Sequence, residues 1–351
     1  MSVTIKDVAK QANVSVATVS RALNGHENVA EAVRQRVLSV ANELRYSPHH
    51  AARSLSSRRT HTIGVVLPDL HGEFFSELMR GIDHGARERG LHLLVSSYHG
   101  NPAEQGAALR AMRGRVDGLL LMSPFVGDSG ALHDNLSPGM PAVLMNSSVA
   151  EADLRAVSVD NYGGAREMVR HLAAAGHRRI AFIAGPANNF DASERLRGYR
   201  DELAASLPDA RPWILEGDFH EASGHRAGGE VLAGAERPDA IFAANDMMAL
   251  GCLFALNHAG VQAPRDIAIA GFDDIPLARY VHPSLTTMRV DIAELGGRAL
   301  RMLLDGMAQQ AEPGAGMDQG EPLVPKLMVR DSSVAGAGGS KARVSAAAVE
   351  A

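Results

Sequence analysis

The sequence predicts a small all-α helix-turn-helix headpiece at the N-terminus, followed by an α/β body of two lobes with parallel, doubly wound sheets. Residues 1–45 show helical periodicity interrupted by turn signals, whereas residues 62–146 alternate short apolar runs with helical stretches. The same alternation starts again at residue 178. Alternating apolar strands and helices are typical of parallel sheets covered on both faces. A chain of 351 residues is long enough for two or three compact units.

The composition is that of a globular protein, with 46% apolar and 21% charged residues. The single cysteine, Cys252, excludes an internal disulfide bond and suits a reducing cytoplasm. The N-terminus lacks the pattern of a signal peptide, and the sequence has no apolar run of the length that spans a membrane. We therefore expect a cytoplasmic protein with no membrane partner.

The formal net charge of −5 is unevenly distributed along the chain. Residues 1–60 contain nine Lys and Arg against four Asp and Glu, so this segment carries +5 and the remainder −10. A basic head on an acidic body is typical of a protein that contacts a polyanion through the head. One solvated basic face would give the same count, so charge alone leaves both interpretations open.

Helix signals divide the N-terminal unit into three short helices. Thr4 and Ser15 are N-cap residues for the first two helices, and Asn24 with Gly25 ends the second. The expected helices cover residues 5–12, 16–23 and about 31–45. The residues expected on the inner faces of the second and third helices are Val19, Ala22, Leu23, Val33, Val37, Val40, Ala41 and Leu44. Two short helices joined by a tight turn predict a helix-turn-helix.

The second helix of such a unit enters the DNA major groove by its N-terminal end. Val16 and Ala17 occupy that end and can lie against thymine methyl groups, and Arg21 can donate to guanine. Short polar residues that we expect at the DNA are Thr4, Ser15, Thr18, Ser20 and Asn24. In the alternative, a plain helical bundle, Ser15 only caps its helix and Arg21 pairs with a carboxylate.

Residues 46–60 join the two parts of the chain. Pro48 suits the start of a helix, and residues 51–55 could form two helical turns, although helices this short are marginal in water. Leu55 lies among arginines that include Arg53, and an apolar wedge of this kind can enter a minor groove. A flexible linker is the alternative interpretation.

The body contains two sets of four apolar runs that predict buried parallel strands. The runs cover residues 62–68, 91–97, 117–123 and 141–146, and then 178–186, 213–219, 240–246 and 267–274. Ligands of such sheets bind beyond the carboxyl ends of the strands. The side chains at those ends are Asp69, Asn146, Phe219, Asn245, Asp246, Asp273 and Asp274. Between two facing lobes they would converge on one cleft.

Enzyme signatures are missing from the sequence. It contains neither a phosphate-binding Gly-x-x-x-x-Gly-Lys loop nor a Gly-x-Ser-x-Gly nucleophile motif. His220 and His225 are five residues apart, which places them about 140° apart on a helix, too far round for one metal ion. We expect neither an enzyme nor a metal or cofactor site. A transport binding protein would share the two-lobed body but would need a signal peptide and no basic head.

The chain resembles the LacI/GalR family of bacterial transcription regulators along nearly its whole length. The motifs that carry the resemblance are TIKDVAKQANVSVATVSRALNG, LRYSPHHAARSL, RVDGLLLM, HLAAAGHRRIAFIAGP, ERLRGY, FAANDMMALG, IAGFDD and HPSLTTMR. The resemblance implies a body like that of periplasmic sugar-binding proteins, with a ligand between two lobes. It implies crossings between the lobes near residues 158–161, 285–290 and 322–326.

The resemblance also implies the domain boundaries. The DNA-binding domain would cover residues 1–46, a hinge helix or linker 47–60, and the effector-binding and dimerisation core 61–331. Within the core, lobe 1 would cover about 61–158 and 289–322, and lobe 2 about 161–286 and 326–331. The small-residue tail 332–351 is expected to be disordered, and without a leucine heptad there we expect a homodimer.

Residue roles follow from the same resemblance. Val16, Ala17 and Arg21 would face base edges, and Leu55 would insert at the central operator step. Effector contacts would come from Phe74, Phe75, Asn146, Asp191, Arg195, Phe219, Asn245 and Asp273. Strand-end capping by Asp273 and core packing by Phe74 are the alternatives.

The implied function is that of a repressor whose affinity for double-stranded operator DNA changes when a small molecule binds. Hydrogen-bonding groups beside a flat aromatic ring suit a mono- or disaccharide, and stacked phenylalanines would also suit a purine. We expect the ligand to lower operator affinity, with corepression as the opposite possibility.

Overall fold

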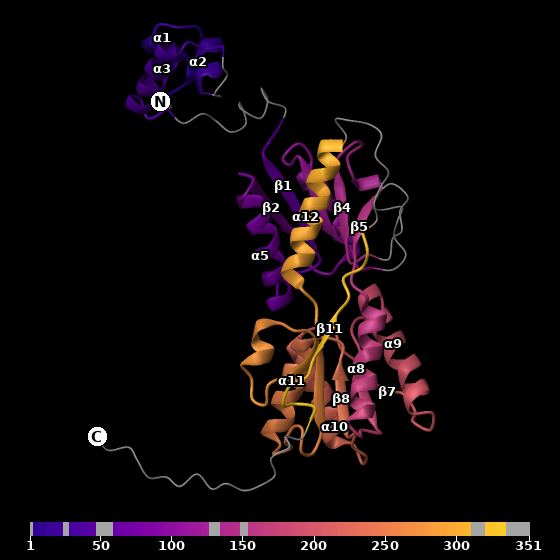
Figure 1. Ribbon diagram of the computed structural model, residues 1–351. Helices are drawn as coiled ribbons and strands as arrows, with labels where there is room; N and C mark the ends of the chain where they lie inside the picture. The colour runs from indigo at the N-terminus through magenta and orange to yellow at the C-terminus, as the bar shows by residue number, and fades with distance from the viewer. Residues whose placement is uncertain are drawn as a thin grey trace, which may run out of the picture. The chain divides into compact units, whose positions relative to one another are not determined.

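The computed structural model describes residues 3–23, 28–46, 59–125, 134–147, 154–309 and 320–334 (Figure 1). The chain divides into two compact units, Met1–His61 and Thr62–Ala351. The expected hinge helix and three of the proposed DNA contacts, Asn24, Arg53 and Leu55, lie outside the described residues. No helix in the described ranges is long and apolar enough to cross a membrane.

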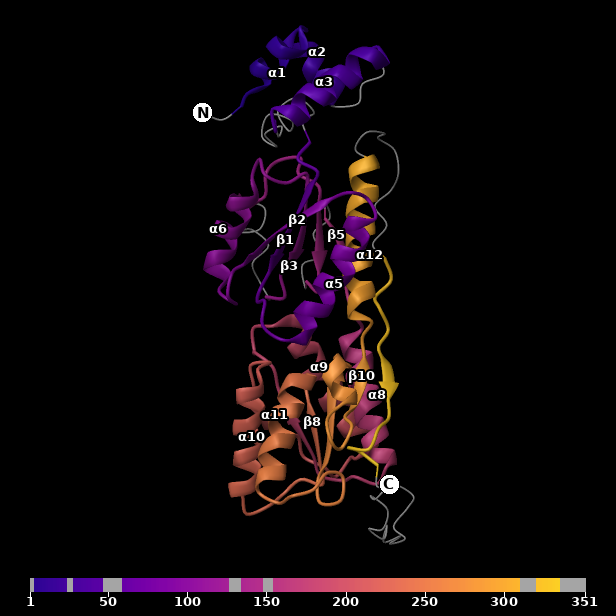
Figure 2. The same cartoon turned by 90° about the vertical axis from the view of Figure 1, so that its left-hand side faces the viewer.

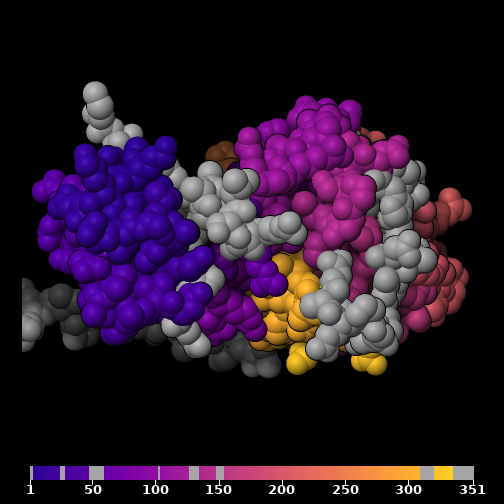
Figure 3. All heavy atoms as spheres, turned by 90° about the horizontal axis from the view of Figure 1, so that it is seen from above, coloured from indigo at the N-terminus to yellow at the C-terminus, as the bar shows by residue number. Residues whose placement is uncertain are grey.

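The N-terminal unit consists of three helices around one apolar cluster. The helices are α1 (Ile5–Ala12), α2 (Val16–Leu23) and α3 (Glu31–Glu43). Val8, Val19 and Val37, one from each helix, are fully buried at the centre. In the space-filling view, the described residues of this unit form one closely packed body (Figure 3). Helical periodicity therefore predicted the inner faces of α2 and α3 correctly.

Local side-chain bonds define the ends of the first two helices. The Asp7 carboxylate accepts hydrogen bonds from the backbone N–H and the hydroxyl of Thr4, at 2.9 and 2.8 Å. Asn13 ends α1 in the left-handed conformation, at φ 53°. Ser15 Oγ accepts from the backbone N–H of Thr18 at 3.0 Å, which is the N-cap bond predicted for α2.

Lobe 1 of the body has a five-stranded parallel sheet in the order β2-β1-β3-β4-β5. Its strands are β1 (Thr62–Leu67), β2 (His92–Ser97), β3 (Gly118–Met122), β4 (Ala142–Met145) and β5 (Arg155–Val157). Helices α5 (Glu73–Arg87) and α12 (Ile292–Gln309) cover one face, and α6 (Pro102–Met112) covers the other. A Cβ on Gly81 of α5 would lie 1.9 Å from the Ala293 carbonyl oxygen, so glycine permits the close crossing of α5 and α12.

Lobe 2 has a six-stranded sheet in the order β11-β10-β9-β8-β6-β7. Its strands are β6 (Ile180–Ile183), β7 (Trp213–Leu215), β8 (Ala240–Ala243), β9 (Ala268–Asp273), β10 (Thr286–Arg289) and β11 (Lys326–Met328). Only β11 is antiparallel to its neighbour. Figure 2 shows α10 (Glu221–Ala233) and α11 (Asp246–His258) on one side of this sheet and α8 (Asn161–Ala174) on the other. Helix α9 (Phe190–Ser206) packs beside α8.

The structure corrects two predictions about the chain path. The second crossing between the lobes was expected near residues 285–290. Most of this segment is instead part of lobe 2, because Thr286–Arg289 forms strand β10 of the second sheet. The expected disordered tail begins too early, because Ser332 and Ser333 are buried. Ser332 Oγ accepts from the Thr286 N–H at 2.8 Å. Both segments are polar, and distant partners satisfy their polar groups.

Candidate functional site

A cavity of about 230 Å³ lies between the two lobes, beyond the carboxyl ends of their strands. Lobe 1 contributes Asp69 after β1 and Met122 at the end of β3. Lobe 2 contributes Asn245 after β8 and Asp273 at the end of β9. The predicted contacts that line the cavity are Phe74, Phe75, Asp191, Arg195, Phe219, Asn245 and Asp273. Asn146 does not line it.

Arg195 is the central buried cation of this cleft. It projects from α9 and is only 4% exposed. Its Nε donates to Asn161 Oδ1 at 2.8 Å, and its Nη1 donates to the Ala244 carbonyl oxygen at 2.6 Å. The guanidinium carbon lies 3.8 Å from the centre of the Phe272 ring. These contacts fix the plane of the guanidinium before any ligand arrives.

Asp273 is the carboxylate partner of Arg195. Arg195 Nη2 lies 3.2 Å from Asp273 Oδ1, an ion pair that leaves this oxygen without a hydrogen bond from any described residue. Burial raises the pKa of Asp273 to about 6, although the charge of Arg195 acts in the opposite direction. Asp273 has a positive φ of 111°, which is rare for a residue other than glycine. Beside this ion pair, the buried Oδ1 of Asp273 can accept a hydrogen bond from a ligand.

Asp191 forms a second acidic position beside Arg195. Burial raises its pKa to about 6; Arg195 lowers it and the charge of Asp273 raises it further. Asn161 Nδ2 donates to Asp191 Oδ1 at 2.9 Å, so Asn161 connects Asp191 with Arg195. The sequence contains no motif that indicates a role for Asn161, which is an isolated polar residue at the end of the first crossing between the lobes. Asn146 lies beside this group, fully buried, with Oδ1 unpaired among the described residues.

Asn245 is engaged within lobe 2. Its Oδ1 accepts from the Met248 N–H at 3.0 Å and so caps α11, while its Nδ2 donates to the Phe219 carbonyl oxygen at 2.9 Å. Phe219 itself adopts a positive φ of 75° and lines the cleft. Gly185 allows this ring to approach, because a Cβ there would lie 2.6 Å from the ring carbons. Asn245 therefore positions the aromatic residue.

Phe74 and Phe75 of lobe 1 contact both the cleft and the apolar core. Phe74 and Phe75 lie in the first turn of α5 with ring centres 5.4 Å apart and ring planes nearly perpendicular. Both rings line the cleft and also pack against the main apolar core. Core packing and ligand contact therefore both describe these side chains.

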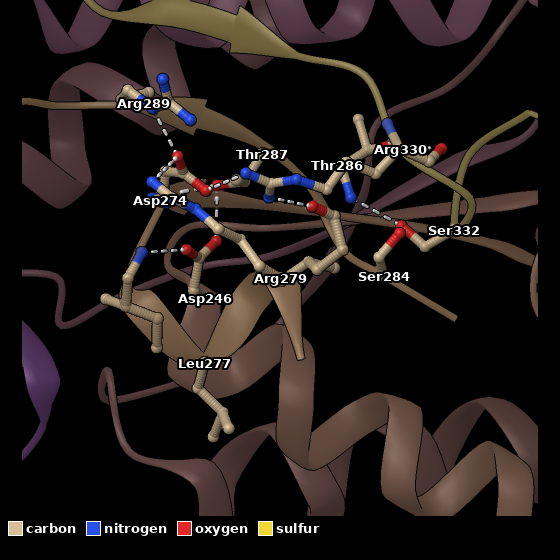
Figure 4. Close-up of polar contacts among 12 residues, drawn as sticks. Asp246, Asp274, Leu277, Arg279, Ser284, Thr286, Thr287, Arg289, Arg330 and Ser332 are labelled. Atoms are coloured by element: carbon tan, nitrogen blue, oxygen red, sulfur yellow. Dashed lines mark hydrogen bonds and ion pairs between the residues drawn. The ribbon is translucent and has the colours of Figure 1, made fainter. Parts of the chain in front are cut away.

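The remaining strand-end carboxylates hold lobe 2 together (Figure 4). Asp274 contacts Arg289 Nε and Arg330 Nη2, each at 2.5 Å, and its side chain is fully buried. Burial acts to raise the pKa of Asp274, but these bonds outweigh it and lower the pKa. Asp246 accepts from Thr287 Oγ1 at 2.6 Å, and burial, followed by the charge of Asp273, raises the pKa of Asp246 well above its ordinary value.

On the N-terminal unit, the predicted base-reading residues are exposed on α2. Val16 is 42% exposed, and Ala17 and Arg21 are also exposed. Arg21 makes no hydrogen bond or ion pair with the residues that the structure describes, in contrast to the carboxylate pairing considered as its alternative. Ser15 and Thr18 are hydrogen-bonded to each other at the start of this helix, at 2.8 Å.

Comparison with known proteins identifies the family. Residues 4–49 match the family of bacterial regulatory proteins of the lacI type, and residues 169–333 match a periplasmic binding protein-like domain. The HTH-type transcriptional repressor PurR of Klebsiella pneumoniae is 35% identical over 333 residues, which cover 93% of this chain and 97% of PurR.

Solved structures agree with this assignment. A lac repressor dimer bound to operator and the anti-inducer ONPF is 30% identical, with a TM-score of 0.84, over 95% of this chain and 100% of the repressor. A CelR–cellobiose complex is 32% identical, with a TM-score of 0.69, over 94% of this chain and 99% of CelR. These relatives are regulators, in agreement with the expectation that the chain is not an enzyme. The chain therefore belongs to the LacI family of DNA-binding bacterial transcription regulators.

Proposed function

We propose that this protein is a repressor that binds its operator as a homodimer and releases it when a small molecule occupies the cleft. The observation that carries the proposal is the buried Asp273 Oδ1, which lies in a cavity between two lobes and has no hydrogen bond from the described residues. A ligand that donates to this oxygen and also touches lobe 1 fixes the angle between the lobes. That angle then sets the spacing of the two DNA-binding units in the dimer.

The dimer assignment is supported by the lac repressor relative, which was solved as a dimer on its operator. Each unit would read one half-site of a pseudo-palindrome, with Val16, Ala17 and Arg21 at base edges. The proposed phosphate contacts are Thr4, Ser15, Thr18, Ser20 and Asn24. Arg53 and Leu55 are proposed for the minor groove at the centre of the operator. The bonds that Ser15 already makes within α2 suggest that its contact with DNA is secondary to capping.

We propose a sugar as the effector. Arg195 donates in a fixed plane, Asp273 and Asp191 accept, and Phe219 offers a flat apolar face, which together match the hydroxyls and ring face of a saccharide. The CelR relative, solved with cellobiose, supports this class. A purine is the second candidate, because Phe74 and Phe219 line the same cavity from opposite lobes and could stack on a flat base.

A thermal-shift screen of mono- and disaccharides, nucleobases and nucleosides tests the effector class. We expect a sugar to raise the melting temperature of the full chain and to lower its affinity for operator DNA. Stabilisation by a purine alone would overturn the sugar assignment. A stabilising ligand that raises operator affinity would reverse the proposed sign and make the protein a corepressed regulator.

A further inference from the structure

Three side chains of the types that bind metal ions lie together at the edge of the cleft, and the function proposed above assigns no role to them. His71 comes from lobe 1, whereas His220 and Glu221 come from lobe 2. One ligand atom from each residue lies within 4.8 Å of the other two. We propose that these three residues bind one divalent transition-metal ion that bridges the two lobes.

The backbone holds the three residues at the starts of two helices. His71 precedes α5, and its N–H donates to Asp69 Oδ1 at 3.0 Å. His220 is the N-cap of α10, and its N–H donates to Asp218 Oδ1 at 2.9 Å. Glu221 is the first residue of α10, where the helix dipole favours a carboxylate. The two lobes therefore present the ligands from anchored positions.

The distances suit a tetrahedral ion. His71 Nε2 lies 3.4 Å from Glu221 Oε2. Ligand bonds of about 2.1 Å in a tetrahedron separate the ligand atoms by about 3.4 Å, so this pair already has the required spacing. The ring centres of His71 and His220 are 5.5 Å apart, and both side chains are partly exposed, so rotation of His220 can bring its nitrogen closer.

The donor set indicates the class of metal. Two imidazoles and one carboxylate favour Zn²⁺, Co²⁺ or Ni²⁺ over Mg²⁺ and Ca²⁺, which prefer oxygen ligands. Asp69 Oδ2 lies 3.8 Å from His220 Nε2 and adds negative charge beside the site. Three protein ligands leave a fourth position for water. Since His71 and His220 also line the cleft, the ion would stabilise the arrangement in which the lobes are closed.

The partner of His220 in this cluster is His71 and not His225, the histidine nearest to it in the sequence. His225 lies five residues further along α10, is exposed, and has its ring 5.8 Å from that of Phe254, away from the cluster. The partner that the fold provides, His71, is 149 residues away in sequence from His220, so no local spacing could indicate it. His225 therefore offers a matched control, because it is a histidine on the same helix outside the site.

Titration of the untagged full chain with Co²⁺ and Zn²⁺, followed by calorimetry and visible absorption of Co²⁺, tests the proposal. We expect one ion per chain, a Co²⁺ affinity at least about tenfold weaker in His71→Ala and in Glu221→Gln, and no change in His225→Ala. Equal affinity of His71→Ala and the unmodified protein, or the absence of stoichiometric binding, would overturn the site.

Thermal unfolding gives a second measurement that does not depend on DNA or effector. Zn²⁺ should raise the melting temperature of the unmodified protein and of His225→Ala, and the increase should disappear in His71→Ala. His71→Ala, Glu221→Gln and His225→Ala should have similar melting temperatures without metal, since the altered side chains are partly or fully exposed. Stabilisation that persists in His71→Ala would contradict a bridge between the lobes. Failure here would leave the repressor proposal untouched.

Discussion

Arg195 and Asp273 form a buried ion pair in lobe 2, with Nη2 of the arginine 3.2 Å from Oδ1 of the aspartate. The arginine is fully positioned by Asn161, Ala244 and the ring of Phe272, whereas the aspartate oxygen has no hydrogen bond from the described residues. Asp273 Oδ1 can therefore accept a further hydrogen bond beside its ion pair with Arg195, and a hydrogen bond to a charged group contributes about 1.5–3 kcal/mol. A ligand hydroxyl that donates to Asp273 would add such a bond.

Replacement of Asp273 by Asn should therefore weaken effector binding. An amide removes the charge and one acceptor position while it keeps the shape, and we expect a loss of about 2–3 kcal/mol in binding free energy, measured by calorimetry with the ligand found by thermal shift. Asp266→Asn is the matched control, because Asp266 pairs with Arg265 on the surface. Equal losses in both variants would remove Asp273 from the site.

Arg21→Ala should weaken operator binding by about 1–3 kcal/mol and relax the sequence preference at one base pair of each half-site. The reason is that Arg21 is exposed on α2 and has no partner among the described residues. Fluorescence anisotropy with the operator and single-base variants measures both effects. A uniform loss on every sequence would instead make Arg21 a phosphate contact. Arg36→Ala, an exposed arginine on α3, gives the baseline for charge loss.

The raised pKa of Asp191 predicts a pH-dependent stability. Its pKa is about 6 in the folded protein against an ordinary value of 3.8 for an aspartate, so between these limits the folded state binds more protons. Stability therefore falls as pH rises through about 6. Asn does not titrate, so Asp191→Asn should not lose this stability. The unfolding free energy of the variant minus that of the unmodified protein should therefore rise by about 1–3 kcal/mol between pH 5 and about pH 7.5.

Asp218→Asn controls for this measurement. Burial acts to raise the pKa of Asp218, but hydrogen bonds from Ser223 and His220 outweigh it and lower the pKa below its ordinary value. Its stability difference from the unmodified protein should be constant across the same range in denaturant titrations. A constant difference for Asp191→Asn as well would contradict the raised pKa.

The close crossing of α5 and α12 predicts a strong effect at one glycine. Gly81→Ala should lower the free energy of unfolding by about 1–3 kcal/mol or more, because the new Cβ would meet the Ala293 carbonyl oxygen. Gly229→Ala in α10 should instead raise it by about 0.5–1 kcal/mol, since nothing lies within 4 Å of its added Cβ. Chemical denaturation measures both, and destabilisation of similar size in the two would contradict the crossing.

The sequence predicted the elements whose apolar residues follow a simple local pattern. The eight expected strands and the inner faces of α2 and α3 are present, because apolar residues are buried where the local pattern places them. Strand β2 differs from the expected burial, since it lies at the edge of its sheet and none of its residues is buried. Strand β10 was not predicted, since Thr286 and Thr287 look polar and their hydroxyls are satisfied by Arg330 and Asp246 from distant segments. The same reason explains Ser332 and Ser333 (Figure 4 includes Ser332).

For the cleft, the resemblance to known motifs indicated most of the residues that line it, but not the side chains that hydrogen-bond to them. Arg195 and Asp273 were expected to contact a ligand, yet Asn161, which organises both Arg195 and Asp191, has no local signal. Asn146 was expected in the cleft and does not line it. Its position follows β4, and its backbone N–H donates to the Val157 carbonyl oxygen at 3.0 Å, so the end of a strand did not by itself predict access to the ligand.

Under the proposed function, occupancy of the cleft controls operator affinity. This coupling is measured by operator binding of the full chain with and without a ligand that calorimetry shows to occupy the cleft, with Asp273→Asn in parallel. We predict that ligand weakens operator binding by about 5–150-fold in the unmodified protein and by much less in the variant at the same ligand concentration. Operator affinity that stays the same when the cleft is saturated would show that the cleft does not regulate DNA binding.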